Sequence, residues 1–458
     1  MRDEYFIKET GMTTSQRTLE QVTMRRVMWR TVPLLILCYI ASYLDRVNIS
    51  YAALTMNHQL GFSSSVYGLG AGVFFLTYFL FEVPSNMMLH RLGASRWIAR
   101  ILLTWGVLSG AMGFIPQIAH LTGLGPQTVF YVIRLLLGAA EAGFFPGVIF
   151  YLTLWFPEAY RARVVGYFMA AMPVAGVVGG PLCGWILGLN GVPGMAGWQW
   201  LFVLEAVPAI VLGFVVLFRL ADRPERAAWL APDQLAWLVA ELGREQRQVQ
   251  HRARHSVWQA MTNPMVIALS LIYFSMTYLN YTLGFFLPTI IHDFGLSDQK
   301  TGLMATIPSA VGAVCMAFWG WHSDRKDERK WHLAFALAVG SVCYLAASLM
   351  HTPLAIIVCF CIAAFGIYGA MPVFWTLPST FLSGASAAAG IAVINAIANL
   401  SGFTGPYLMG WLKSVTGGYT AGMLAAAILG GIATLTVAGF GRHRFPVGQP
   451  AMQDGLGK

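Results

Sequence analysis

The sequence predicts an all-α membrane protein whose twelve transmembrane helices form two six-helix pseudo-repeats. The chain has 458 residues, of which 57% are hydrophobic and only 11% are charged, whereas a soluble protein carries about 25% charged residues. Apolar segments long enough to cross a bilayer follow one another along nearly the whole chain. The basic residues gather in alternate connections between these segments, as is typical of membrane proteins.

The apolar segments give the expected elements in order. A helix of about 20 residues spans the roughly 30 Å of hydrocarbon in a bilayer. We expect helices at residues 31–54, 65–89, 97–116, 127–154, 163–188, 199–219, 264–291, 300–321, 332–350, 353–377, 386–412 and 418–440. The predicted domains are a tail (1–28), a first bundle (29–220), a linker (221–262), a second bundle (263–441) and a second tail (442–458). In the linker, the stretch after Pro232 predicts one or two amphipathic helices.

The positions of the 29 lysines and arginines predict the orientation. Arg46 and Arg134 lie inside apolar segments, and Lys300 and Lys413 lie in connections of one parity. The others lie at the termini or in the alternate connections, which places both termini in the cytoplasm. The net charge of +9 therefore indicates a bilayer and not a nucleic acid. The first ~25 residues are polar, so we expect no signal peptide, and translation begins at Met1 or Met12.

The sequence contains no pattern that calls for a metal or a cofactor. The six cysteines lie in apolar segments without ligand partners, and no two histidines have metal-ligand spacing in a polar cluster. The P-loop pattern for nucleotide binding is missing as well. We therefore expect no metal, no cofactor, no direct drive by ATP and no enzyme activity.

The two halves of the chain correspond at several positions, but they differ in charge. Tyr43-Leu44-Asp45-Arg46 corresponds to Tyr278-Leu279-Asn280-Tyr281. Such parallel repeats are typical of transporters that rock two halves about a central site. The apolar segments of the first half hold Asp45, Arg46, Glu82, Arg134, Glu141 and Glu205, whereas those of the second half hold no charged residue well inside. Because a charge in the bilayer is costly and indicates a functional site, we place the charge chemistry in the first half.

One loop sequence carries a resemblance to a known family. The run Gly320-Trp-His-Ser-Asp324-Arg325-Lys326-Asp-Glu-Arg329-Lys330 resembles the loop signature of the major facilitator superfamily. The corresponding loop of the first half contains Arg91 and lacks the aspartate, as in the anion:cation symporter family. The runs Glu82-Val-Pro-Ser-Asn86, Trp200-Leu-Phe-Val-Leu-Glu205 and Asn395-Ala-Ile-Ala-Asn399 are also similar to that family.

The resemblance covers residues 25–440 and implies the major facilitator fold with a function in anion transport. Members of the family move organic anions, usually with protons. The runs Tyr167-Phe-Met-Ala-Ala-Met-Pro173 and Phe374-Trp-Thr-Leu-Pro378-Ser look most like those of bacterial tartrate-type and hydroxy-acid permeases. The resemblance further implies that Arg91, Asp324 and Arg325 form the cytoplasmic gate motif.

Arg46 and Arg134 are the candidate anion ligands. A guanidinium stays charged when buried and presents a planar fork that matches a carboxylate. The alternative is that each arginine forms a fixed salt bridge with Asp45 or Glu141. The family resemblance implies that Arg46 contacts the substrate directly. For Arg134 we expect that it helps to set the state of Glu141.

Asp45 and Glu141 are the candidate proton-coupling residues. Burial favours the neutral form of a carboxyl group, and a neighbouring arginine favours the charged form. If the balance changes with conformation, a proton is taken up on one side and released on the other. Protonation would free an arginine for the substrate carboxylate, and fixed structural pairing is the alternative. For Glu82 and Glu205 we expect a gating or helix-packing role.

Further polar and aromatic residues are expected to line the site. Tyr43 lies one turn before Arg46, and Tyr78 lies one turn before Glu82. Met172-Pro173 stands where some family members carry a glutamine, which favours a shorter anion than a long sugar acid. The second half is expected to contribute Asn280, Tyr281, Trp375, Thr376, Asn395 and Asn399.

The sequence thus predicts a proton-coupled symporter that imports a small organic anion, such as tartrate or a sugar acid, by alternating access. We expect a monomer in the bacterial inner membrane, whose partners are the anion, protons and lipid. One alternative is an exporter that exchanges protons or anions for an anionic metabolite. Another is a transporter-like anion receptor, although the longest polar segment has only about 40 residues, too few for the ~100 or more of a typical signalling domain. Concentrative uptake distinguishes the symporter from both.

Overall fold

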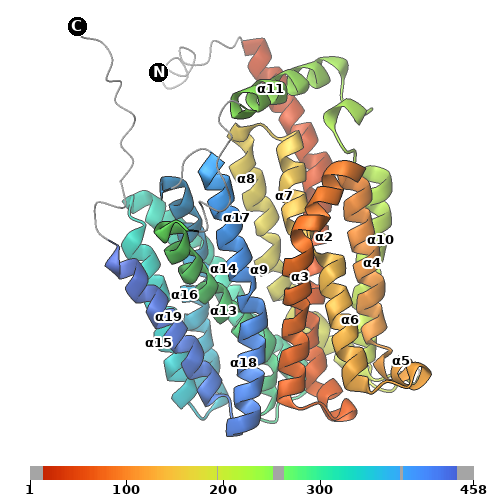
Figure 1. Cartoon of the computed structure of the whole chain (residues 1–458), viewed down its shortest axis with the longest axis vertical. Coiled ribbons are helices and arrows are strands. Elements are labelled where there is room, and N and C mark those ends of the chain that lie inside the picture. Colours follow the sequence, from red (N-terminus) through yellow and green to blue (C-terminus); the bar gives the residue numbers. More distant parts are fainter. Residues whose placement is uncertain (1–13, 193, 251–261, 382–384, 441–458) are drawn as a thin grey trace.

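The computed structural model describes residues 14–192, 194–250, 262–381 and 385–440, which contain helices and no β-strand (Figure 1). The predicted C-terminal tail and the choice between Met1 and Met12 lie outside these residues. The first half forms α2 (Thr14–Leu60), α3 (Ser64–Leu92), α4 (Ala94–Met112), α5 (Ile115–Thr122), α6 (Pro126–Glu141), α7 (Phe144–Trp155), α8 (Glu158–Met169), α9 (Ala171–Leu187) and α10 (Gly197–Arg219).

The linker and the second half are helical too. The linker forms the 3-10 turn η1 (Pro224–Arg226) and α11 (Pro232–Gln250), which fits the predicted amphipathic helix. The second half forms α13 (Pro264–His292), α14 (Asp298–Lys326), α15 (Lys330–Leu349), α16 (Pro353–Phe381), α17 (Ala385–Asn399), α18 (Ser401–Thr416) and α19 (Thr420–Gly439).

Each predicted apolar segment falls on a helix or on a broken pair of helices. In the described part of the chain, ten helical spans are long and apolar enough to cross a membrane, if α6 with α7 (Pro126–Trp155) and α8 with α9 (Glu158–Leu187) each count as one span. The number is eleven if α4 and α5, which meet at 84°, also count as one. The eleventh predicted segment corresponds to α17 and α18, which have 15 and 16 residues and are interrupted at Leu400. The predicted segments 127–154 and 163–188 each form one span, but the helix is interrupted after Glu141 in the first and at Ala170 in the second.

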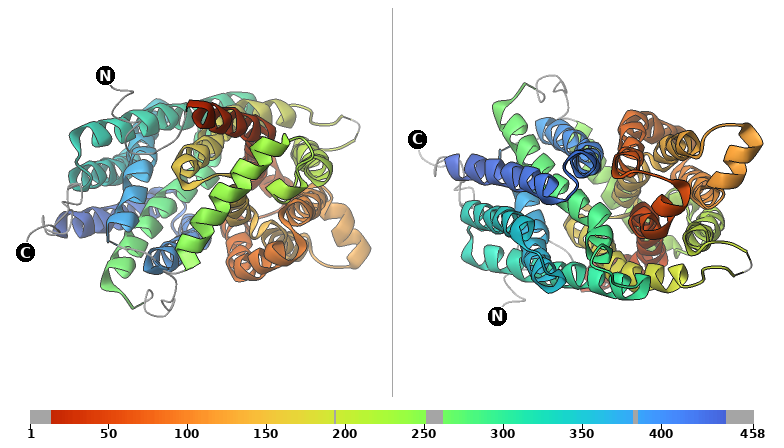
Figure 2. Two further views of the ribbon diagram at one scale, coloured as in Figure 1. Left: turned by 90° about the horizontal axis from the view of Figure 1, so that it is seen from above. Right: turned by 90° about the horizontal axis from the view of Figure 1, so that it is seen from below.

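The N-terminal part of α2 and the linker helix α11 mark one end of the molecule, here called the linker end (Figures 1 and 2). The opposite end, here called the far end, holds the starts of α3 and α14 and the ends of α9 and α18. At the far end, α3 packs on α18 and α9 packs on α14, so each contact joins the two halves. Glycines allow this approach: a Cβ on Gly68 would lie 2.4 Å from Pro406 O, and one on Gly180 would lie 2.3 Å from Gly302 O.

Candidate substrate and proton site

An ion pair joins α2 to α6 at the centre of the first half. Arg46 Nη2 binds Glu141 Oε1, which also accepts a hydrogen bond of 3.0 Å from Ser42 Oγ. Glu141 is 1% exposed and is the last residue of α6. The chain breaks there because Gly143 has a φ of +85°, and a Cβ at this position would lie 2.4 Å from Ser85 Oγ. The break thus places a carboxylate at a helix end inside the bundle.

Aromatic rings surround the guanidinium of Arg46. The centroids of Phe74, Phe75 and Tyr78 lie 5.6, 5.9 and 5.4 Å from Arg46 Cζ, which is within cation–π range. Tyr281, from the second half, makes a side-chain hydrogen bond with Arg46. Among the described residues, no acceptor bonds to Arg46 Nε. The arginine therefore keeps one buried donor unused, beside the Nη2 that holds Glu141.

Asp45 points away from Arg46 and toward α4. Its Oδ2 accepts from Trp105 Nε1, and its Oδ1 accepts from Ser109 Oγ and, at 3.0 Å, from Asn48 Nδ2. Consecutive residues of a helix point about 100° apart, so these neighbours on α2 face different helices. Of the two carboxylates considered as partners of Arg46, the structure pairs it with Glu141.

Arg134 ties α6 to the backbone of α3. The side chain is 1% exposed, and it donates from Nε to Gly70 O at 3.0 Å and from Nη2 to Ala71 O at 3.1 Å. The described residues contain no ion pair between Arg134 and either Glu141 or Asp45. The fixed salt bridge considered as the alternative for Arg134 is therefore not formed in this structure, and the contact of Arg134 with the anion stays a prediction.

Besides Asp45 and Glu141, a third acidic side chain, that of Glu205, is buried in the first half. Glu205 is 6% exposed, and its Oε1 accepts a hydrogen bond of 3.2 Å from Cys183 Sγ. Its Oε2 has no hydrogen-bond partner in the described part of the chain. The side chain of Asn48 lies between the two acids, because it bonds Asp45 and also interacts with Glu205. The first half thus holds a polar track from Asp45 through Asn48 to Glu205.

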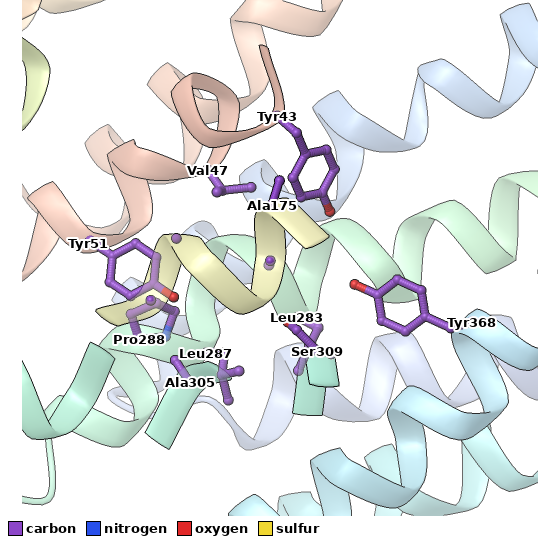
Figure 3. Close-up of a pocket in the computed structure, with 14 residues that line it drawn as sticks. Tyr43, Val47, Tyr51, Ala175, Leu283, Leu287, Pro288, Ala305, Ser309 and Tyr368 are labelled. Atoms are coloured by element: carbon purple, nitrogen blue, oxygen red, sulfur yellow. The ribbon is translucent and has the colours of Figure 1, made fainter. Parts of the chain in front are cut away.

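A small cavity, here called the central cavity, lies between the halves and is lined in part by α2. Figure 3 shows Tyr43, Val47 and Tyr51 of α2 facing Ser309 of α14 and Tyr368 of α16 across it. Its volume is about 40 Å³, enough for about three or four water molecules at roughly 10–15 Å³ each. Side chains from both halves line it.

The structure brings some of the other predicted residues together. Tyr78 and Tyr281 meet Arg46, as described, and Tyr43 makes a side-chain hydrogen bond with Tyr368. Asn399 donates a hydrogen bond of 3.4 Å to Glu82 Oε2, so these two residues link the halves.

The remaining predicted residues lie elsewhere in the second half. Trp375 packs edge-on against Tyr273 at 4.9 Å, and Thr376 Oγ1 donates to Val373 O at 2.7 Å. Asn280 is buried and Asn395 is half-buried one turn before Asn399.

Sequence reasoning missed the neutral side chains that hold the acids. Ser42 lies one turn before Arg46, and Trp105 and Ser109 lie one turn apart in the third apolar segment. Two polar groups on one face of an apolar segment are a signal that could have identified Trp105 and Ser109.

Comparison with known proteins decides the family. The family model described as "Major Facilitator Superfamily" matches residues 35–406, and a second match covers 269–455. The chain belongs to the Major Facilitator Superfamily. This membership confirms the predicted fold class and identifies a multi-pass membrane transporter and not an enzyme.

Relatives within the superfamily are similar over nearly the full chain. A protein of Agrobacterium vitis named "Putative tartrate transporter" is 45% identical over 437 residues, which are 95% of each chain. The "Quinolone resistance transporter" of Acinetobacter baumannii is 39% identical over 90% of this chain and 93% of its own. The crystal structure of a bacterial homologue of the human lysosomal transporter Spinster, described as inward-facing and unoccupied, has a TM-score of 0.73 at 19% identity and covers 89% of this chain and 95% of that one.

The superfamily loop motif is ordered by hydrogen bonds at the linker end of α14. Asp324 pairs with Arg329 at 2.5 Å, and Arg325 lies over the Trp321 ring at 5.4 Å. Burial alone would raise the pKa of Glu328, but hydrogen bonds from the Trp331 and His332 backbones and the His332 side chain lower that pKa. The corresponding Arg91 is exposed.

The corresponding loop of the first half lacks an aspartate at the position of Asp324. There a carboxylate from the linker, Asp222, contacts the start of α4. Asp222 Oδ1 accepts a hydrogen bond of 2.8 Å from Ser95 N in the first turn of α4. Sequence comparison of the two loops could not identify this residue, because it lies outside the loop.

Proposed function

We propose that the protein is a proton-coupled symporter that imports a small hydroxycarboxylate, such as tartrate or a sugar acid. The observation that carries the proposal is the ion pair between buried Glu141 and partly buried Arg46, whose Nε has no hydrogen-bond partner among the described residues. Both relatives named above are transporters, and one is named for tartrate. A partly buried guanidinium at the boundary between the two halves suits an anionic substrate.

The pair gives a mechanism for coupling. Glu141 binds Nη2 of the guanidinium, and the adjacent Nε has no hydrogen-bond partner in the part of the chain that the structure describes. A proton on Glu141 removes the charge that holds the arginine. A substrate carboxylate then takes both Nε–H and Nη2–H in the bidentate geometry that arginine favours. Asp45, which accepts hydrogen bonds from three neutral donors, is the second proton site in this proposal.

In this proposal, residues of the second half contact the part of the substrate that Arg46 does not bind. Tyr281 reaches Arg46 from α13, and the hydroxyls of Tyr43 and Tyr368 face the central cavity. In this proposal they bond the hydroxyl groups and second carboxylate of the anion. The present cavity of about 40 Å³ must widen to admit it. The Glu82–Asn399 contact would part and re-form as the halves rock.

The positions of the lysines and arginines in the sequence support an orientation of the protein with its linker end in the cytoplasm. With the linker end in the cytoplasm, the glycine contacts of the far end close the site on the outer side. The proposed conformation is therefore closed to the outside, and import requires separation of α3 from α18 and of α9 from α14. We propose a monomer in the bacterial inner membrane with both termini in the cytoplasm.

Export of an anionic compound is the second candidate function, favoured by the 39% identity to the quinolone resistance transporter. The two candidates differ in the direction in which a proton gradient drives the substrate. A symporter accumulates anion on the side that protons enter. An exchanger depletes it there.

The test is uptake of radiolabelled tartrate by liposomes that contain the purified protein, with the outside more acidic. We expect accumulation above equilibrium that collapses with a protonophore, and competition by unlabelled sugar acids. Accumulation only when the inside is more acidic would establish the exporter instead. If no hydroxycarboxylate moves in either direction, with folding verified by circular dichroism, the proposal is wrong.

A further inference from the structure

An open groove of about 550 Å³ lies at the linker end, between the start of α2 and the linker. Arg25, Arg26 and Arg30 line it from α2 together with Val22 and Trp29, and Trp229 and Gln234 line it from the linker. In Figure 2 the first turns of α2 lie beside α11 in the view onto this end. The groove lies outside the transmembrane site described above.

The arginines of the groove carry uncompensated charge. Arg26 Nη1 donates to Gln234 Oε1 at 3.2 Å, and Arg30 lies over the Trp229 ring at 5.9 Å. Both partners are neutral, and none of the three arginines forms an ion pair with an acid in the described ranges. Three guanidinium groups within two helical turns repel one another. An anion in the groove would relieve this repulsion and bind through charge-assisted hydrogen bonds.

The groove lies where α2 leaves the hydrocarbon. The helix has 47 residues, about 70 Å at 1.5 Å per residue, which is more than twice the roughly 30 Å needed to span a bilayer. Trp29 is 73% exposed, and exposed tryptophans concentrate at membrane interfaces. The arginines therefore lie at the depth of lipid headgroups.

An apolar stripe continues from the groove toward the centre of the membrane. Arg26, Arg30, Pro33 and Leu37 follow at helical spacing on one face of α2, and Leu37 is 53% exposed. An acyl chain attached to a headgroup in the groove would lie along this face. A soluble metabolite would instead need an enclosed pocket that buries most of its surface.

We infer that this groove binds the phosphate headgroup of an anionic phospholipid, such as phosphatidylglycerol. The phosphate bonds Arg25, Arg26 and Arg30, and the rings of Trp29 and Trp229 pack against the glycerol backbone. The bound lipid joins the linker to the start of α2. It would thus hold the connection between the two halves at the membrane surface, whichever anion the transporter carries.

The test is native mass spectrometry of the delipidated full-length protein titrated with phosphatidylglycerol. The triple variant Arg25→Gln, Arg26→Gln, Arg30→Gln removes the groove charge. The matched control, Arg96→Gln, Arg219→Gln, Arg223→Gln, removes the same charge from three exposed arginines at the linker end outside the groove. We expect the dissociation constant to rise at least 5-fold in the groove variant and less than 2-fold in the control.

A single-residue variant and a competition experiment complete the test. Arg25 forms no hydrogen bond or ion pair within the described ranges, so Arg25→Gln alone should raise the dissociation constant about 2-fold even if the triple variant folds poorly. Glycerol 3-phosphate at millimolar concentration should not displace the lipid. Equal effects of the groove and control variants would overturn the inference. Displacement by glycerol 3-phosphate would show a site for a soluble phosphate, which also overturns it.

Discussion

At the scale of single residues, geometry separates two buried arginines that look alike in sequence. Arg46 holds a carboxylate, aromatic rings and a tyrosine of the other half, and it keeps Nε free of acceptors. Arg134 donates hydrogen bonds from Nε and Nη2 to two backbone carbonyls of α3. In the proposed mechanism Arg46 exchanges its carboxylate partner for the substrate, whereas Arg134 connects α6 to α3. Their variants should therefore fail in different ways.

Arg46→Lys should raise the dissociation constant of tartrate at least 10-fold. Lysine keeps the positive charge but loses the planar fork, and one charge-assisted hydrogen bond contributes roughly 1.5–3 kcal/mol. Isothermal titration calorimetry on the purified variant measures the constant, and a thermal melt within a few degrees of wild type shows that the fold is kept. Unchanged affinity would remove Arg46 from the binding site.

Arg134→Lys should instead lower the melting temperature and change the tartrate dissociation constant less than 3-fold. The substitution leaves at least one interhelix hydrogen bond unmade in a site that is 1% exposed, which costs about 1–3 kcal/mol. Calorimetry and thermal unfolding of the same sample separate the two effects. A 10-fold weaker affinity at an unchanged melting temperature would make Arg134 a direct ligand, as the sequence predicts.

Which carboxylate pairs with Arg46 could not be predicted from the sequence. Asp45 and Arg46 are adjacent, so their side chains diverge around α2, and Trp105 and Ser109 of α4 hold the aspartate. Glu141 reaches Arg46 because α6 ends there and the chain turns at Gly143. Charged residues in apolar segments reveal that a site exists, but their partners depend on how the helices are rotated.

At the scale of elements, broken helices are what the apolar-length criterion misses. Segments 127–154 and 386–412 look continuous by hydrophobicity, yet they break at Ala142–Gly143 and at Leu400. Both breaks lie next to predicted site residues, Glu141 and Asn399. Interruptions of this kind are typical of transporter binding sites, because unpaired backbone groups and local adjustments are tolerated where the backbone lines a cavity.

The glycine contacts at the far end give a prediction for α3 and α18. Gly68→Ala places a Cβ 2.4 Å from Pro406 O, a backbone atom, so α18 must shift at a cost of about 1–3 kcal/mol. We expect the far end to open more often. The readout is the rate at which a membrane-impermeant maleimide labels Ser309→Cys in the central cavity, corrected for labelling of the same protein without that cysteine.

Gly166→Ala is the control for this experiment, since a Cβ there meets no atom within 4 Å and the residue lies in α8. Labelling should be faster in the Gly68 variant and unchanged in the Gly166 variant. Equal rates in both would mean that the Gly68 contact does not close the far end.

At the scale of the whole molecule, the internal repeat and the charge asymmetry were readable from sequence. The repeat appears in matched positions such as Tyr43 and Tyr278, and the asymmetry in the absence of charge from the apolar segments of the second half. The close packing of the two halves at the far end could not be predicted from the sequence, because it depends on contacts between α3 and α18 and between α9 and α14. Small residues reveal that helices pack closely, but not which partner they meet.

The central claim is that a proton on Glu141 lets the substrate carboxylate replace it on Arg46. Titration calorimetry of tartrate in buffers with different ionisation enthalpies counts the protons taken up per anion bound. The matched variant is Glu141→Gln, which mimics the protonated acid and keeps its size.

For the wild type we predict an uptake of about one proton per anion and weaker affinity at higher pH. For Glu141→Gln we predict that tartrate binding persists across pH. The variant should take up less than half as many protons per bound anion as the wild type. If the variant binds tartrate with the same proton uptake as the wild type, Glu141 is not the coupling residue and the account is contradicted.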